Sequence, residues 1–192
     1  FIVMAASDEA ELVRMINTST EINDRPCAFR YPRGIGLGSI LPSINEKIEI
    51  GKSKIVKEGK KLAILNFGAR LSETLKAAEN LSKKGVLITV VDARFAKPLD
   101  ENLIWQLATT HEAMMTIEEG SIGGFGSHVV NFLTKKGLMD SNLKFRSLTL
   151  PDVFIDQDTP EKMYKLANLD SVSIEEKVLD LLNSNIVLKK QN

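Results

Sequence analysis

The run LAILNFG at residues 62–68 decides the fold class of this chain. Four successive apolar residues, with Gly68 closing the run, are typical of a strand that is buried on both faces. The residues that follow change to a helical period, with an apolar stripe made by Leu71, Leu75, Ala78 and Leu81. Gly85 then stops the helix. A buried strand followed by an amphipathic helix predicts an α/β fold.

The same alternation continues along the rest of the chain. Further buried strands are expected at residues 86–91, 113–117 and 144–150. A helix capped by Asp100 and a helix around Val129–Leu133 separate them. Thr159-Pro160 and the capping-box pair Ser173 and Glu176 start the last two helices. We therefore expect an α/β domain with a mostly parallel open sheet and helices on both faces.

The first part of the chain forms a smaller unit. Residues 1–5 and 27–31 read as strands, and the helix between them is capped by Ser7 or Asp8. A β-α-β unit of this size is too small to stand alone. The chain also opens on Phe1, inside a strand-like run and without an initiator methionine. We therefore expect a C-terminal portion of a longer protein.

These patterns predict four segments. Residues 1–35 are the end of a truncated domain, and residues 36–52, rich in glycine and polar residues, are the linker. Residues 53–185 are the main α/β domain, and residues 186–192 are a frayed tail.

Composition excludes several classes of partner. Lys plus Arg and Asp plus Glu both number 25, so the net charge is +0 and no long-range field favours nucleic acid or an anionic membrane. We find no apolar run long enough to cross a bilayer. Cys27 is the single cysteine, which rules out an internal disulfide and suits a cytoplasmic protein. Its apolar strand context predicts a buried, inert thiol.

The segment RYPRG at residues 30–34 has two interpretations. It is either a strand end with solvated charges or a fixed cationic site for a phosphate or carboxylate. The motif alone favours the first.

A second candidate site follows the strand at residues 113–117. The glycine-rich run from Gly120 to His128 leads into a helix, where backbone N–H groups can bind an anion. Glu118 and Glu119 lie just before it and would repel phosphate, so close backbone packing is the favoured interpretation. Because adjacent strand residues point to opposite sides, these two glutamates are not a paired acid and base.

No complete catalytic constellation is visible in the sequence. His111 and His128 are the only histidines and lack metal-ligand spacing, so we interpret both as structural residues. The chain also lacks a nucleophile elbow and a metal cluster. From the residues alone, it reads as an α/β piece without a visible active site.

Taken together, several stretches resemble the C-terminal end of the 1-deoxy-D-xylulose-5-phosphate synthase family, within the transketolase-like thiamin diphosphate enzymes. They occur in the family's order over nearly all of residues 1–185. The stretches are RYPRG, LAILNFG, VVDARFAKPLD, HEAMMTIEEGSIGGFGSHV and LTLPDVFIDQDTPEKMY. RYPRG and LPDVFI favour the synthases over transketolase and the β subunits of 2-oxo acid dehydrogenases.

The resemblance implies a three-domain, cytoplasmic homodimer that condenses pyruvate with glyceraldehyde 3-phosphate and releases CO2. The product feeds isoprenoid and thiamine biosynthesis. The first domain would bind the diphosphate and Mg²⁺, and the second the pyrimidine of thiamin diphosphate. Residues 1–35 would end this pyrimidine-binding domain, and residues 53–185 would be the third domain.

The resemblance assigns one substrate-binding residue to this chain. The second arginine of RYPRG contacts the aldehyde's phosphate in the family, and the matching position is Arg33. Strand alternation places Arg30 on the opposite face, so it is not carried over, and Arg30 and Tyr31 are kept as structural candidates or as residues that support the site without touching the substrate. The family's Gly-Asp-Gly metal motif, its activating glutamate and its proton-handling histidines are absent, and His111 and His128 do not match them. We therefore expect no catalytic, cofactor or metal residue here, and an inactive chain without the remainder of the protein.

Two rival interpretations remain open. One is another transketolase-like enzyme with a different acceptor. The other is a non-catalytic interaction or regulatory module, which the missing motifs favour and the strand-first N-terminus disfavours.

Overall fold

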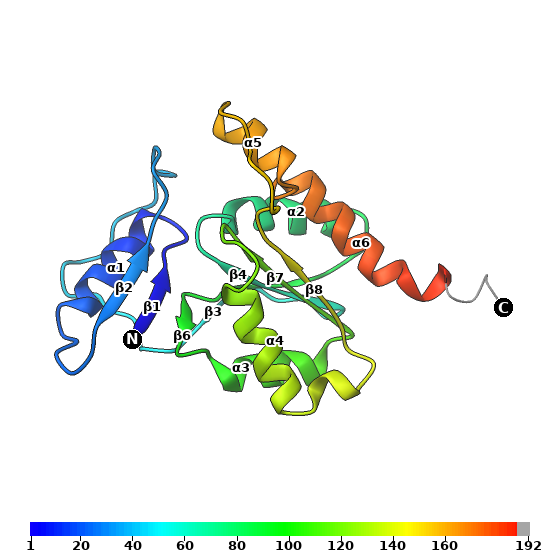
Figure 1. The fold of residues 1–192 in the computed structure, drawn as a ribbon, viewed down its shortest axis with the longest axis horizontal. Helices are drawn as coiled ribbons and strands as arrows, with labels where there is room; N and C mark the ends of the chain where they lie inside the picture. Colours follow the sequence, from blue (N-terminus) through cyan, green and yellow to red (C-terminus); the bar gives the residue numbers. More distant parts are fainter. Residues whose placement is uncertain (188–192) are drawn as a thin grey trace.

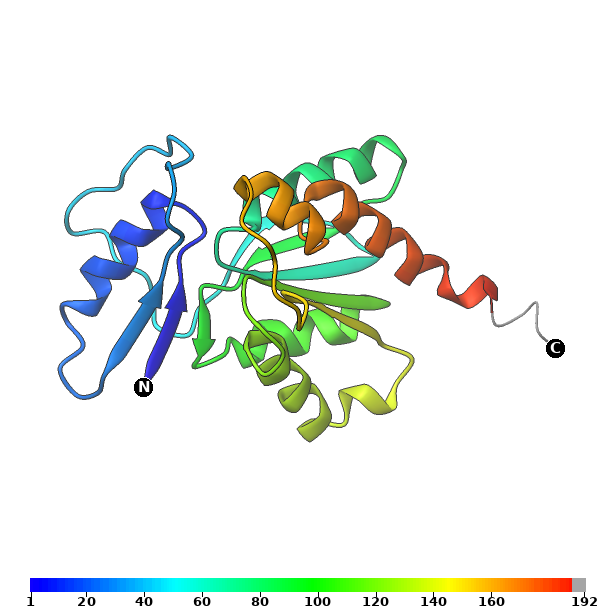
Figure 2. The same cartoon turned by 45° about the horizontal axis from the view of Figure 1, so that its top comes forward.

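The computed structural model describes residues 1–187 and contains two sheets, which lie side by side in Figures 1 and 2. The larger sheet has five strands in the order β3-β5-β4-β7-β8. Strands β5, β4, β7 and β8 are parallel, and β3 joins β5 in antiparallel pairing. Their bounds are Lys54–Lys57 (β3), Leu62–Phe67 (β4), Thr89–Asp92 (β5), Ala113–Glu118 (β7) and Lys144–Leu148 (β8).

Helices cover both faces of this sheet, which confirms the predicted fold class (Figure 2). On one face, α3 (Glu101–Thr110) and α4 (Phe125–Lys135) pack with the short 3-10 helix η1 (Leu138–Asp140). On the other face, α2 (Leu71–Lys83) packs against α6 (Ser171–Val187). All six residues of β4 are buried, as the run LAILNFG predicts for a central parallel strand.

Capping side chains set the starts of several helices. Asp100 accepts a hydrogen bond from the Leu103 N–H at 3.2 Å, and Asp8 accepts one from the Glu11 N–H at 2.7 Å, as predicted. The last helix differs from the prediction. It begins at Ser171, and Asp170 rather than Ser173 accepts the N-terminal bond, from the Ser173 N–H at 3.2 Å.

The smaller sheet has the order β2-β1-β6. Strand β1 (Ile2–Ala5) pairs in parallel with β2 (Cys27–Arg30), and α1 (Glu9–Ser19) connects them, so the predicted β-α-β unit is present. The sequence did not predict β6 (Phe95–Lys97), which comes from the main domain and pairs with β1 in antiparallel. Phe95 is 1% exposed and completes the small core around Met4 and Met15.

Polar contacts also join the two sheets. Ser7 Oγ donates to Asp92 Oδ2 at 2.6 Å, and both residues are buried. The Glu11 carboxylate pairs with the Arg94 guanidinium, with both N–O distances at 2.8 Å. Together with β6, these contacts fix the N-terminal unit on the main domain. Within residues 1–187, no helix is both long and apolar enough to cross a lipid bilayer.

Candidate functional site

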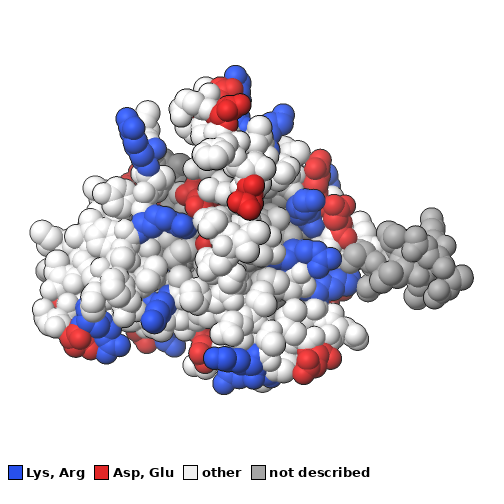
Figure 3. All heavy atoms as spheres, in the orientation of Figure 1, with Lys and Arg blue, Asp and Glu red and all other residues white. Residues whose placement is uncertain are grey.

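A cavity of about 610 Å³ lies where the carboxyl ends of strands from both sheets meet. Open parallel sheets bind ligands at this edge. The smaller sheet contributes Ala5, Ala6 and Arg30, and the larger sheet contributes Gly68 and Glu119. The segment at residues 150–155 and helix α5 (Pro160–Leu166) form an apolar wall. Figure 3 shows a hollow between the tip that follows β2 and the tip that carries α5, with both basic and acidic side chains beside it.

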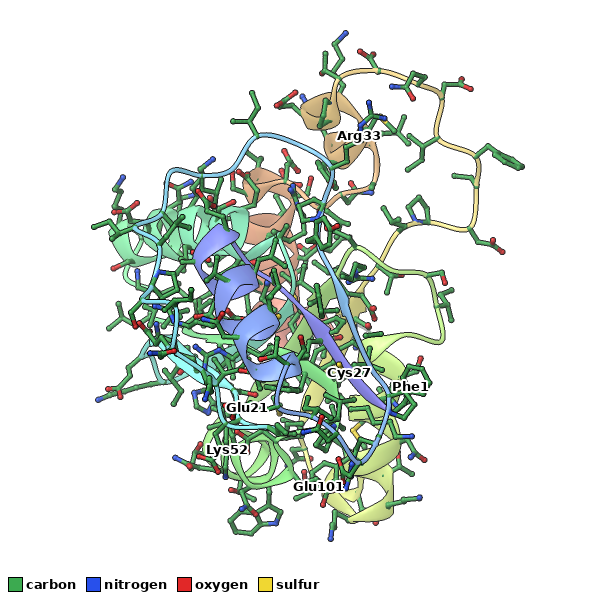
Figure 4. All side chains as sticks on the ribbon, turned by 90° about the vertical axis from the view of Figure 1, so that its left-hand side faces the viewer. Phe1, Glu21, Cys27, Arg33, Lys52 and Glu101 are labelled. Atoms are coloured by element: carbon green, nitrogen blue, oxygen red, sulfur yellow. The ribbon has the colours of Figure 1, made fainter. Side chains whose placement is uncertain are left out.

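Both arginines of RYPRG line this cavity. The prediction that Arg30 faces away from Arg33 is therefore wrong. Strand β2 ends at Arg30, so the alternation of a pleated strand does not extend to Arg33. The Tyr31-Pro32 pair leaves the strand direction, and Figure 4 shows Arg33 beyond the end of β2, on the side of α5.

Arg33 is exposed, and among the described residues its guanidinium has no hydrogen bond or ion pair. Its charge is therefore free to meet a ligand. The role of Arg33 as a phosphate ligand stays a prediction.

Arg30 is held at the junction of the two sheets. Its guanidinium carbon lies 5.2 Å from the centre of the Phe67 ring, and Nη1 donates a weak hydrogen bond to the Glu119 carbonyl at 3.5 Å. Gly68 and Gly120 lie beside it. A Cβ on either glycine would be in ordinary van der Waals contact with the guanidinium, 3.7 Å from Nη2 and 3.5 Å from Nη1 respectively.

The third charged residue of the cavity, Glu119, is already neutralised. Its Oε1 lies 2.9 Å from Nε of Arg70, and both side chains are 14% exposed. Burial, with Glu119 beside the ring hydroxyl, raises the pKa of Tyr164 to about 12, so Tyr164 is neutral near pH 7. Within residues 1–187, neither arginine of the cavity has a carboxylate partner of its own, which favours an anionic ligand.

Glu118 points away from Glu119, as predicted. Glu118 is 2% exposed and accepts a hydrogen bond from the Gly126 N–H at 2.9 Å, on the α4 face. A Cβ on Gly120 would lie 2.5 Å from Glu118 Oε2, and one on Gly124 would lie closer still. The glycine-rich run therefore packs around the protein's own carboxylate, and an added phosphate would meet that charge. This geometry supports the close-packing interpretation.

The remaining candidates lie outside the cavity lining. His111 Nε2 is 2.8 Å from Thr89 Oγ1, and burial lowers the pKa of His111, as for a structural histidine. His128 is exposed on α4. Cys27 was predicted to be buried but is only partly so, because β2 is an edge strand of its sheet (Figure 4). Within residues 1–187, no group of three or more His, Cys, Asp or Glu side chains could hold a metal ion.

Comparison with known proteins agrees with this architecture. Residues 51–174 match the family model described as "Transketolase, C-terminal domain". A solved structure described as "Split gene transketolase, inactive beta4 tetramer" superposes with a TM-score of 0.79 at 26% sequence identity. The match covers 95% of this chain and 58% of that one, so this chain spans little more than half of that relative.

Proposed function

The chain belongs to the transketolase C-terminal domain family, and on that premise we propose that it is the C-terminal portion of a thiamin diphosphate-dependent transferase. More specifically, we propose a 1-deoxy-D-xylulose-5-phosphate synthase, which condenses pyruvate with glyceraldehyde 3-phosphate and releases CO2. The order of the sequence stretches and the pair RYPRG and LPDVFI support this choice over other members of the group.

The observation that carries the proposal is a positively charged side chain in the cavity that has no negatively charged partner among residues 1–187. Arg33 lines the cavity and, among the described residues, has no carboxylate partner. A guanidinium stays charged at any physiological pH and grips two phosphate oxygens with parallel N–H donors. We assign Arg33 to the phosphate of the aldehyde substrate.

Thiamin diphosphate and Mg²⁺ do not fit the residues described here. The family's Gly-Asp-Gly metal motif and activating glutamate do not occur in this sequence, and the Glu118 carboxylate occupies the glycine-rich loop. We therefore place the cofactor site in the remainder of the protein. The chain alone is expected to be inactive, and the complete protein to be a cytoplasmic homodimer. The similar split-gene transketolase is an inactive tetramer, which is consistent with catalysis that needs another part.

A second candidate function is a transketolase-type subunit. The structural similarity to a split-gene transketolase favours it. The two candidates differ in the donor, because a transketolase takes a two-carbon unit from a ketose phosphate, whereas the synthase decarboxylates pyruvate.

The experiment compares the complete protein with the 192-residue chain. Both receive thiamin diphosphate, Mg²⁺ and glyceraldehyde 3-phosphate, with either pyruvate or a ketose phosphate as donor. We expect 1-deoxy-D-xylulose 5-phosphate and CO2 from the complete protein with pyruvate, and no product from the chain alone. Activity only with the ketose donor would replace the synthase by the second candidate. Activity of the chain alone would contradict our placement of the cofactor site.

A further inference from the structure

We propose that Arg30 and Glu9 are positioning residues, which hold from both ends the loop of residues 31–36 that presents Arg33. The inference rests on the proposed role of Arg33 in phosphate binding. It concerns two residues that do not themselves need to touch the substrate.

Arg30 anchors the start of the loop through both its backbone and its side chain. Its carbonyl accepts the Ala6 N–H at 3.0 Å, and it pairs in register with Ala5 of β1. Its guanidinium crosses to the larger sheet, where it lies over Phe67 at the end of β4 and contacts the Glu119 carbonyl at the end of β7. Arg30 therefore ties the start of the loop to both sheets.

Glu9 anchors the end of the loop. Its carboxylate accepts backbone N–H groups from Leu37 at 3.0 Å, Gly38 at 2.6 Å and Ser39 at 2.9 Å. Backbone hydrogen bonds lower the pKa of Glu9, so the carboxylate that holds the loop is charged at neutral pH. A Cβ on Gly36 would lie 2.7 Å from Glu9 Oε1, so a larger residue there would displace the carboxylate from its present position.

The loop between these anchors needs them. Residues 31–36 contain no helix or strand, and all six residues are exposed. Pro32 restricts its own backbone and that of Tyr31 but cannot fix where the loop lies. The place of Arg33 therefore depends on Arg30 and Glu9, and a displacement of about 1 Å in such a group is enough to weaken a bidentate contact greatly.

The kinetic test uses the complete enzyme with phosphorylated and unphosphorylated glyceraldehyde as acceptors. Arg30→Met and Glu9→Gln should each raise KM for the phosphorylated acceptor about tenfold, the scale for a misplaced binding group, and leave KM for the unphosphorylated one unchanged. Arg30→Lys, which keeps the charge but not the planar stack, should restore little of the loss. Adding Arg30→Met to Arg33→Met should cause no further change.

Two kinetic outcomes would overturn the inference. Additive effects of Arg30→Met and Arg33→Met would mean that Arg30 contacts the phosphate itself. Equal effects of Arg30→Met on both acceptors would mean that it only supports the fold. Thermal unfolding of each variant separates a general loss of structure from a specific one.

A second measurement needs no catalysis. Trypsin should cut the Arg33–Gly34 bond of the complete protein several-fold faster in Arg30→Met and Glu9→Gln than in the wild type, because cleavage follows local opening. Cleavage after Lys136, an exposed residue at the end of α4, serves as the reference within each digest. Unchanged cleavage after Arg33 would refute the anchoring. If the wild type fails with pyruvate and the aldehyde, the proposed function fails, while this digest still decides whether the anchors exist.

Discussion

The guanidinium carbon of Arg70 lies 3.5 Å from the centre of the Tyr164 ring. The same guanidinium pairs with Glu119, so Tyr164 and Glu119, which both line the cavity, share one arginine. Helix α5 has no fully buried residue, and Tyr164 is one of its few partly buried side chains. This stack is therefore a main attachment of α5 to the main domain.

Replacing Tyr164 should loosen the cavity wall. Tyr164→Leu removes the stack on Arg70 and should lower the free energy of unfolding by about 1 kcal/mol, the scale of a half-exposed cation–π contact. Tyr164→Phe keeps the ring and should cost less. Urea titration followed by circular dichroism measures both, with Leu166→Ala on the exposed side of α5 as the control. A loss for Phe equal to that for Leu would show that the hydroxyl, and not the ring, holds α5.

The Glu118 carboxylate should be needed at the start of α4. Glu118→Gln keeps the shape but removes the charge that accepts the Gly126 N–H, and we expect a loss of about 1–2 kcal/mol in the free energy of unfolding. Glu112→Gln, one strand position before the buried run, is the matched control because Glu112 is exposed. If the two variants are equally stable, the glycine-rich loop does not need the negative charge of the Glu118 carboxylate.

Arg33 should determine the preference for a phosphorylated acceptor. In the complete enzyme, Arg33→Met should raise KM for glyceraldehyde 3-phosphate by about ten- to a hundredfold, the scale of a lost charge-assisted hydrogen-bond pair. The KM of Arg33→Lys should lie between those of Arg33→Met and the wild type, because lysine keeps a positive charge but lacks the paired N–H donors of a guanidinium. Steady-state kinetics with unphosphorylated glyceraldehyde is the control and should not change. A parallel loss with both acceptors would remove Arg33 from phosphate binding.

Much of the fold is predictable from local patterns, as β4 and α3 illustrate. The apolar run at residues 62–67 and the Asp100 cap depend on neighbours in sequence, and both were predicted correctly. Strand β6 was missed because Phe95–Lys97 is three residues long and has no period of its own. It is a strand only because β1, at the N-terminus and far from it in sequence, pairs with it.

The site shows the same limit. The family resemblance, and not the motif alone, pointed to Arg33, whereas strand alternation misplaced Arg30 because β2 ends at Arg30 and the chain leaves the strand direction at Tyr31-Pro32. The pairing of Glu9 with residues 37–39 spans about thirty positions and has no sequence signal. The one hint was that Glu9 is the first residue of helix α1. A carboxylate at that position is equally well explained by its favourable interaction with the helix dipole.

Stability should fall with rising pH because of Asp92. This carboxyl is 1% exposed, and burial, with Glu11 nearby, raises its pKa to about 6, against the opposing hydrogen bond from Ser7 and the charge of Arg94. The folded state therefore holds a proton that the unfolded state has released above its pKa near 3.8. Between about pH 4 and pH 6 the free energy of unfolding should decrease, by at most about 3 kcal/mol.

Asp92→Asn isolates this effect, because asparagine resembles the protonated carboxyl and does not titrate. Other carboxylates add their own slopes, so the measured quantity is the difference between variant and wild type. Urea unfolding at pH 4, 5, 6 and 7 should show the variant gaining stability relative to the wild type as pH rises to about 6, with no further gain above it. Asp180→Asn, on an exposed position of α6, should leave the pH profile unchanged. A constant difference between Asp92→Asn and the wild type would mean that Asp92 stays ionised in the folded protein, held by Arg94 and the Ser7 hydroxyl.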